Sequence, residues 1–307
     1  MTTSTLGPDL VIAGTARSGT SALAAQLGTH PGIDACSIKE PNYFSRSHDR
    51  GPDWYDGLFQ TRREGLLRMD ASTSYTSPLY PDALDRLADE APDVFVVYAV
   101  RHPTRRAVSH YLFRHYHFHN EPAADFGAAL RSSTRFVDTG DYSRWLPALR
   151  KRFPAERLLV VPFEVVTESP QAAAAAVHRM SGLTDVQADE ERGRTHRNEV
   201  VQYRSALARW SARRLRDSAL YPKLRTALGA DRVRRARDLV TRRATMPTFD
   251  EALASCNAGQ LTELRALDQR AGAAVSEHLA AQDQRLGLAW EPRSFAAGLS
   301  SDARRST

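Results

Sequence analysis

The 307-residue sequence contains little cysteine, no long apolar run and no recognisable leader segment. Its two cysteines, Cys36 and Cys256, stand far apart and outside any metal-ligand spacing, which argues against a disulfide framework and favours reduced thiols. No apolar run approaches the roughly 18 residues that a membrane helix needs. Residues 1–9 lack the basic and apolar regions of a signal peptide, so we expect a cytoplasmic location.

The composition is that of an ordinary soluble globular protein, with 42% apolar and 25% charged residues. The formal net charge of +6 favours anionic partners but does not choose among nucleotides, sulfated sugars, nucleic acids and lipid head groups. The length fits one large domain over 1–307, with a core at 9–185, a basic helical part at 190–290 and a disordered tail at 292–307. The abundance of alanine and arginine is typical of a high-GC bacterial source.

Short apolar runs alternate with segments of helical periodicity along the chain. We expect strands at 10–13, 33–37, 66–71, 94–100 and 158–163. We expect helices at 21–29, 81–89, 104–119, 142–153, 171–180 and 252–286. The unbroken β-branched run at 94–100 is typical of a parallel strand covered on both faces. The pattern predicts an α/β fold, a P-loop-like central parallel sheet flanked by helices, with a helical C-terminal portion.

A glycine-rich loop follows the first expected strand. Gly14 and Gly19 have the spacing G-x-x-x-x-G, and a helix follows them. Such a strand–loop–helix unit binds anions with free backbone N–H groups and the helix dipole. A nucleotide-cleaving P-loop would carry lysine at position 20, where this sequence has Thr20, and the cation here is Arg17 inside the loop. The loop therefore predicts phosphate binding without the lysine of kinases and NTPases.

A second candidate anion site follows the strand at 94–100. Arg101 ends that strand, and Ser109 lies on the helix after it. The guanidinium and the hydroxyl can converge on one phosphate across such a turn. Taken alone, the pattern equally allows Arg101 to end the strand without a ligand and Ser109 to face solvent.

Several segments together resemble the PAPS-dependent sulfotransferases. Gly14 to Thr20 resembles the 5′-phosphosulfate loop of that family, and residues 101–111 resemble its 3′-phosphate motif, R-[DN]-P-x-x-R-[AL]-x-S. Lys39 to Phe44 is similar to the K-E-x-x-F-F segment of the heparan-sulfate-type branch. Residues 51–55, 59, 70–75 and 163–165 follow in that branch's order, so the resemblance covers 9–165 closely and extends loosely to Trp290.

The resemblance implies a sulfotransferase that moves a sulfuryl group from PAPS to a hydroxyl, or less readily an amine, and releases PAP without a metal. The acceptor would be a carbohydrate, a glycolipid or a secondary metabolite. Arg17 would stabilise the departing phosphate, and Glu40 would be the general base. The implied donor contacts are Arg17, Ser18, Gly19, Thr20 and Ser21 at the 5′ end, Arg101 and Ser109 at the 3′ phosphate, and Arg192, Gly193 and Arg194 in a closing loop.

Two positions depart from the family pattern. His102 replaces the usual asparagine or aspartate between Arg101 and Pro103, which changes how the following helix begins. Ala71 and Thr73 stand where the heparan-sulfate branch has lysine and proline in E-K-[ST]-P-x-Y. Because the lysine of that motif assists the reaction in the branch, its absence argues against a heparan-like acceptor.

The alternatives are of different classes. A P-loop kinase or NTPase would need lysine at position 20. A non-catalytic nucleotide-binding protein of the same fold would not need Glu40. In that case Glu40 would form a surface ion pair with Lys39 or an arginine. His115 and His119 could hold zinc or contact the acceptor, although a surface histidine cluster is the simpler interpretation.

The remaining alternatives concern surfaces. Between 192 and 243 arginines outnumber acidic residues about fourfold, which indicates a solvated basic helix or a donor-closing segment. No recognised nucleic-acid-binding module accompanies this charge, so we expect no nucleic-acid partner. A homo-oligomer is compatible with the sequence. Some aromatic residues could line an acceptor wall or belong to the core: Tyr43, Phe44, Trp54 and Tyr75.

Overall fold

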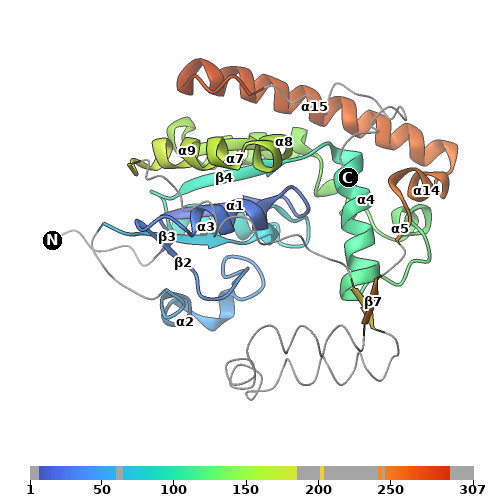
Figure 1. The fold of residues 1–307 in the computed structure, drawn as a ribbon, viewed down its shortest axis with the longest axis horizontal. Helices are drawn as coiled ribbons and strands as arrows, with labels where there is room; N and C mark the ends of the chain where they lie inside the picture. Colours follow the sequence, from blue (N-terminus) through green and yellow to red (C-terminus); the bar gives the residue numbers. More distant parts are fainter. Residues whose placement is uncertain (1–6, 60–64, 185–200, 204–240, 244–245, 291–307) are drawn as a thin grey trace.

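The computed structural model describes residues 7–59, 65–184, 201–203, 241–243 and 246–290. Its centre is a sheet of five parallel strands in the order β2-β3-β1-β4-β5 (Figure 1). All five expected strands are confirmed. Their bounds are Leu10–Gly14 for β1, Ile33–Ala35 for β2, Leu67–Ala71 for β3, Phe95–Val100 for β4 and Leu158–Pro162 for β5.

The strands are buried on both faces, as the apolar runs predicted. In β1, Leu10 and Ile12 join one hydrophobic cluster while Val11 and Ala13 join the other. The first face is covered by α1 (Thr20–Leu27), α8 (Phe163–Glu168) and α9 (Pro170–Ser181). The second face is covered by α3 (Ala83–Glu90), α7 (Tyr142–Arg152) and α15 (Ala258–Leu286). The strand expected at 158–163 is one residue shorter, because Phe163 begins α8.

A smaller hydrophobic cluster lies beside the sheet. It gathers residues of α4 (Pro103–Leu112), α5 (Phe126–Ser132), α6 (Arg135–Asp138) and α14 (Phe249–Ala254). The helix expected to run to residue 119 changes after α4 into a π-helix, η3 (Phe113–Phe118). The short elements are α2 (Pro52–Asp56) and the 3₁₀ turns η1 (His48–Arg50), η2 (Thr73–Thr76) and η4 (Ala155–Arg157).

The C-terminal helix predicted at 252–286 is two helices, α14 and α15. Each begins with a capping box, Thr248 with Glu251 and Asn257 with Gln260, so α15 has its own start signal. The break also makes room for α5, since a Cβ on Gly127 would lie 2.1 Å from the Ser255 carbonyl oxygen. The T-x-x-E and N-x-x-Q patterns in the sequence could have indicated both starts.

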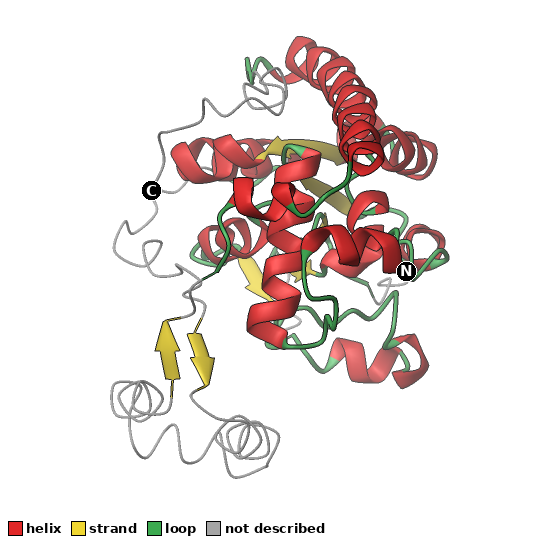
Figure 2. Ribbon diagram, turned by 90° about the vertical axis from the view of Figure 1, so that its right-hand side faces the viewer, coloured by secondary structure: helices red, strands yellow, loops and turns green. Residues whose placement is uncertain are grey.

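Most of the basic segment between 192 and 243 lies outside the described residues. Two short described pieces of it, β6 (Val201–Tyr203) and β7 (Thr241–Arg243), form an antiparallel pair where the sequence favoured helix. Figure 2 shows these two strands apart from the central sheet.

The aromatic residues proposed for an acceptor wall are mainly core residues. Tyr43, Phe44 and Tyr75 are buried in the cluster on the second face of the sheet. Trp54 packs against the edge of that cluster and carries the Arg50 guanidinium 3.9 Å from its ring centre. The core alternative is therefore confirmed for the three buried rings.

Candidate functional site

The site lies where the strand order changes direction. The chain leaves β1 toward β2 and β3 on one side, and β4 stands on the other side of β1. In open α/β sheets, ligands bind in the crevice at the carboxyl ends of two such strands. The glycine loop follows β1 and Arg101 follows β4, so the fold brings the two predicted phosphate sites to one crevice.

The glycine loop is fastened to β4 by its own polar groups. Thr15 donates to the Ala99 carbonyl through its amide at 2.8 Å and its hydroxyl at 2.9 Å. The buried Ser18 places its hydroxyl 2.7 Å from that of Thr15, and its amide donates to the Thr15 carbonyl at 3.1 Å. Ser18 therefore shapes the loop in this structure, and its predicted contact with the donor stays a prediction.

The start of α1 leaves backbone donors available. Gly19 has a φ of 84°, a left-handed conformation that glycine adopts without strain, and its carbonyl accepts from Ala22 and Leu23. Among the described residues, no acceptor is found for the amides of Gly19, Thr20 and Ser21. These three N–H groups can bind an anion at the positive end of the helix dipole.

The arginines of the two predicted sites are joined by hydrogen bonds, in which Arg17 also reaches Ser109. Arg17 Nε donates to Ser109 Oγ at 3.2 Å, and Arg101 Nη1 donates to the Arg17 carbonyl oxygen at 3.2 Å. Each guanidinium also lies over an aromatic ring, that of Arg17 at 4.1 Å from the centre of Phe113 and that of Arg101 at 4.3 Å from Phe163. The structure thus brings together Arg17, Arg101 and Ser109, as the sequence predicted.

The positive charge of this pair is not neutralised by the described part of the chain, where neither Arg17 nor Arg101 forms an ion pair. Burial lowers the pKa of Arg17. Burial and the Arg17 charge lower the pKa of Arg101 to about 10, against a weaker opposing effect of Glu164. Both arginines are still charged at neutral pH, and the crevice therefore favours an anionic ligand.

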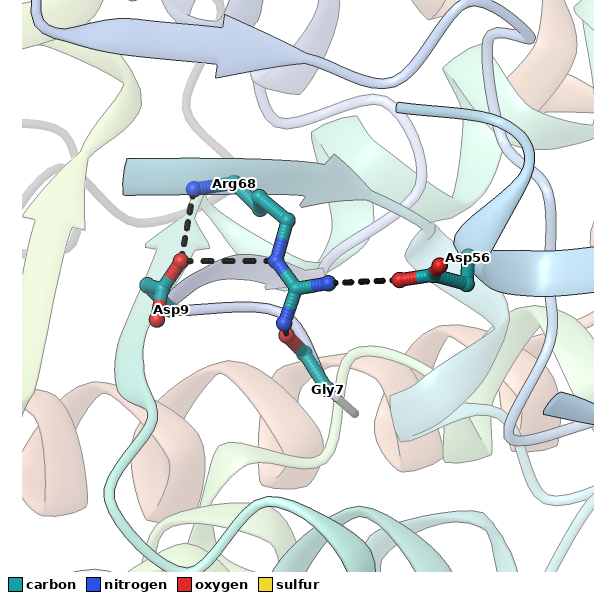
Figure 3. Close-up of polar contacts among 4 residues, drawn as sticks. All are labelled: Gly7, Asp9, Asp56 and Arg68. Atoms are coloured by element: carbon teal, nitrogen blue, oxygen red, sulfur yellow. Dashed lines mark hydrogen bonds and ion pairs between the residues drawn. The ribbon is translucent and has the colours of Figure 1, made fainter. Parts of the chain in front are cut away.

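Arg68, near the amino end of β3, is by contrast an arginine with carboxylate partners. Its Nη1 donates to Asp56 Oδ1 at 2.9 Å and its backbone amide donates to Asp9 Oδ2 at 2.8 Å. Figure 3 shows its guanidinium between the two carboxylates, with a further bond to the Gly7 carbonyl. Arg17 and Arg101, at the carboxyl end, have no such carboxylate contact in the part of the chain that the structure describes.

Arg106 is a site residue whose role the sequence did not indicate, although it is the second arginine of the 3′-phosphate motif. It is fully buried, and its guanidinium donates to the carbonyls of Ala16 at 3.3 Å and Phe136. Burial and the Arg106 charge lower the pKa of His110, whose Nδ1 lies 3.3 Å from Arg106 Nη1. Arg106 therefore stabilises the backbone of the glycine loop through its hydrogen bond to the Ala16 carbonyl.

A pocket of about 200 Å³ opens beside the arginine pair. One wall is cationic and adds Arg105, which stacks 4.6 Å from the centre of Phe249 on α14. The other wall is apolar. The lining residues are Arg17, Arg101, Arg105, Val108, Ser109, Leu112, Phe113, Met246 and Phe249. Sequence reasoning missed Arg105 and α14, because the residues that meet here are more than a hundred positions apart.

Glu40 lies near the carboxyl end of β3, beside β1. Thr73 of η2 donates to Glu40 Oε1 at 3.3 Å. The same turn is tied to β1, since Thr76 Oγ1 donates to the Ala13 carbonyl at 3.0 Å. Within the described residues Glu40 forms no ion pair with Lys39 or with an arginine, so the surface-pair alternative finds no support there.

A buried hydroxyl network holds the Glu40 segment. Asp70 is fully buried and accepts from Tyr55 at 2.8 Å, from Tyr75 at 2.6 Å and from Ser72 at 2.6 Å. Burial raises the pKa of Asp70, and the three hydroxyl donors oppose that rise. Ser72 Oγ in turn accepts from the Asn42 amide at 3.0 Å, which links this network to the backbone beside Glu40.

The histidines at 115 and 119 do not form a recognisable metal centre. His115 Nδ1 lies 3.0 Å from the Glu121 carbonyl oxygen. In the ranges that the structure describes, no three His, Cys, Asp or Glu side chains are grouped so as to hold a metal ion. Both cysteines are free, as expected. No helix of the described residues has the length and hydropathy of a membrane span.

A family model for the sulfotransferase domain matches residues 7–205. The chain belongs to the sulfotransferase family. The curated relatives that it resembles include heparan sulfate sulfotransferases. Mouse heparan sulfate glucosamine 3-O-sulfotransferase 6 is 31% identical over 191 residues, covering 60% of this chain and 54% of the relative. The human 3B1 enzyme of the same name is 27% identical over 194 residues, covering 60% and 48%. The chain thus spans about half the length of these relatives.

Solved structures support the fold of this sulfotransferase-family chain. A sulfotransferase from Alicyclobacillus acidocaldarius has a TM-score of 0.53 at 23% identity and covers 68% of this chain and 93% of its own. Mouse sulfotransferase SULT7A1 complexed with PAP has a TM-score of 0.51 at 15% identity and covers 91% and 88%. The α/β fold with a P-loop-like parallel sheet is therefore confirmed.

The predicted site residues divide into three groups. Arg17 bonds to Ser109 and accepts from Arg101, all three line one pocket, and Glu40 is held beside the next strand. The loop residues 18–21 follow β1 at the start of α1, and Ser18 is buried against Thr15. Arg192, Gly193 and Arg194 lie outside the described residues.

Proposed function

We propose that this chain transfers a sulfuryl group from PAPS to an acceptor hydroxyl, or less readily an amine, and releases PAP. The proposal depends on one observation: Arg17 and Arg101 stand without a carboxylate partner in the described structure and line one pocket together with Ser109, which accepts from Arg17. The residues present suit a nucleotide with two anionic ends. Backbone donors and Arg17 follow β1, and Arg101 and Ser109 follow β4.

Each residue has a distinct task in the proposed reaction. PAPS supplies the sulfuryl group that is transferred. The amides of Gly19, Thr20 and Ser21 bind the 5′ end, together with Arg17, and Ser18 shapes that loop. Arg17 stabilises the negative charge that develops on the departing phosphate, and as an arginine it keeps its own proton. Arg101 and Ser109 bind the 3′ phosphate, and Arg105 adds a third cation to the same pocket.

Glu40 is the proposed general base. Its carboxylate is held by Thr73 and is free of arginine partners among the described residues, so it can accept the acceptor's proton. We also propose that Arg192, Gly193 and Arg194 close over the donor, on the strength of their likeness to the family's [KR]-G-R-x-H loop.

The Glu40→Gln variant tests the base. We expect unchanged PAP affinity and turnover that falls by about a hundredfold or more, because the amide cannot accept the proton. A turnover assay with labelled PAPS and an accepted hydroxylated substrate measures this. Glu168→Gln, at an exposed glutamate of α8, is the matched control and should keep full turnover. Near-normal turnover of Glu40→Gln would assign the base to another residue.

The acceptor is proposed only by class. The relatives carry names with heparan sulfate glucosamine, yet Ala71 at the end of β3 lacks the lysine of that branch. We therefore propose another carbohydrate, a glycolipid or a secondary metabolite. A screen of hydroxylated acceptors with labelled donor, with heparan sulfate among them, tests this choice.

Further expectations belong to the same proposal. The reaction needs no metal, so turnover should persist in excess EDTA. A bacterial source, a cytoplasmic location, compatibility with a homo-oligomer and the absence of a nucleic-acid partner stay predictions from the sequence. The kinase alternative is not favoured, because Thr20 replaces the P-loop lysine and the matched family is a sulfotransferase family. A labelled-donor assay that finds binding without turnover would favour the non-catalytic alternative.

A further inference from the structure

The helix that carries Ser109 does not cap its own N-terminus. His102 occupies the N-cap position of α4, and its side chain accepts no hydrogen bond from the α4 backbone. Asparagine or aspartate, the residues of the family motif at this position, are among the strongest N-caps because a side-chain oxygen accepts from the first free amides. With histidine here, α4 needs another acceptor for those amides.

Asp268 of α15 supplies that acceptor. Its Oδ1 accepts from the Thr104 amide at 2.9 Å, and its Oδ2 accepts from the Thr104 hydroxyl at 2.8 Å. His102 Nδ1 lies 3.4 Å from the same Oδ1. The side chains of His102 and Asp268 are only 2% and 11% exposed. A largely buried carboxylate at a helix N-terminus also interacts favourably with the helix dipole.

Other contacts join the Arg101 turn to α15. The Tyr142 hydroxyl accepts from the Arg101 amide at 3.0 Å and donates to the Arg101 carbonyl at 2.7 Å. Asp141, just before Tyr142, forms an ion pair with Arg270 of α15 at 2.9 Å. Helix α15 packs against both α4 and α7, and it lies above α7 in Figure 1. The backbone on each side of His102 is therefore fixed by groups that α15 supplies or holds.

We propose that Asp268 is a positioning residue for the 3′-phosphate site: it caps α4 from α15 in place of residue 102 and so fixes Arg101 relative to Ser109. The inference rests on the proposed function, since it assigns Asp268 to the donor site described above. The proposal predicts that an asparagine at position 102, a residue type of the family motif, restores PAP affinity when Asp268 is removed.

Calorimetric titration with PAP and AMP tests this, because only PAP carries the 3′ phosphate. We expect Asp268→Ala to weaken PAP binding about tenfold or more, while AMP affinity changes less than threefold. The double variant D268A/H102N should bind PAP within about threefold of the wild type, because the introduced asparagine then caps α4 itself. Glu263→Ala removes an exposed carboxylate of the same helix and should leave both affinities unchanged.

The contrary outcomes are equally definite. Wild-type PAP affinity in Asp268→Ala would overturn the inference, as would an equal loss for PAP and AMP that H102N does not repair. If Asp268→Ala fails to fold, Asp268→Asn keeps one acceptor, and its PAP affinity should fall between those of the wild type and a variant lacking Arg101. A wild-type protein that binds no PAP would overturn the proposed function itself, and this inference with it.

Discussion

Arg101 is a cation that the fold buries without neutralising. Its guanidinium lies over the Phe163 ring and bonds to the Arg17 carbonyl, while a second arginine stands beside it. Burial and the Arg17 charge lower its pKa to about 10, so the unfolded chain binds this proton more tightly than the folded chain does. Below pH 10 the charged Arg101 therefore destabilises the ligand-free fold, and the cost fades only as the pH rises above 10. A bound dianion would offset it.

The variant Arg101→Met tests this balance. Methionine keeps much of the length of the side chain and removes the buried charge, so we expect the unfolding free energy without ligand to rise by about 1 kcal/mol. PAP should stabilise the wild type more than the variant, because the variant lacks the cation for the 3′ phosphate. Urea unfolding with and without PAP measures both effects.

Arg68→Met is the contrasting control. It removes the guanidinium that pairs with both Asp9 and Asp56, so we expect a loss of about 2 kcal/mol or more. If Arg101→Met lost as much stability as Arg68→Met, Arg101 would be a structural arginine and not one reserved for a ligand.

At the residue scale, the sequence predicted those residues that belong to short contiguous motifs. Arg17, Arg101 and Ser109 belong to short motifs that place a cation or hydroxyl after a strand, and the structure brings them together. Tyr142 and Asp268 could not be predicted, because their partners lie 41 and 164 residues away in the chain. Only the folded structure shows which distant polar group forms the hydrogen bonds to the Arg101 backbone and to the start of α4.

At the element scale, α15 protects the outer strand of the sheet. β5 is an edge strand, whose free N–H and C=O groups would otherwise face water or another chain. The buried Gln282 accepts from the Val160 amide at 2.8 Å and donates to the Val160 carbonyl at 3.0 Å. One amide side chain thus replaces a neighbouring strand at this point.

The variant Gln282→Leu should destabilise the fold by about 2–4 kcal/mol, because two buried backbone groups lose their partner. Gln284→Leu is a matched control, since Gln284 is exposed two residues further along α15, and it should change stability by less than about 0.5 kcal/mol. Chemical denaturation of both variants gives the comparison. Equal small losses would show that water satisfies Val160 when Gln282 is removed.

Helices and strands with a clear apolar periodicity were predicted well, but the π-helix and the break between the last two helices were not. The strands and the helices α1, α3, α7 and α9 agree with the apolar spacing to within a few residues. The π-helix η3 and the break before α15 depend on tertiary packing, in the second case on the close approach of Gly127 to Ser255. Periodicity alone does not report such contacts, although the Asn257 capping box offered a local signal.

At the scale of the whole molecule, the two ends of the sheet have different chemistry. At the amino end Arg68 is matched by carboxylates (Figure 3), and at the carboxyl end Arg101 bonds to the Arg17 carbonyl in a pocket that both line. The family match ends at residue 205, yet α15 lies beyond it and supplies both Gln282 and Asp268. The C-terminal helix α15 thus forms hydrogen bonds both to the edge strand β5 and to the start of α4.

The most direct test of the account compares PAP with AMP in the wild type and in Arg101→Met, by calorimetry at neutral pH. The account predicts that the wild type prefers PAP by about 30-fold or more, equivalent to about 2 kcal/mol for the 3′ phosphate. In Arg101→Met this preference should shrink to within about threefold, while AMP affinity is retained. Equal affinities for PAP and AMP in the wild type, or a preference that survives in Arg101→Met, would contradict it.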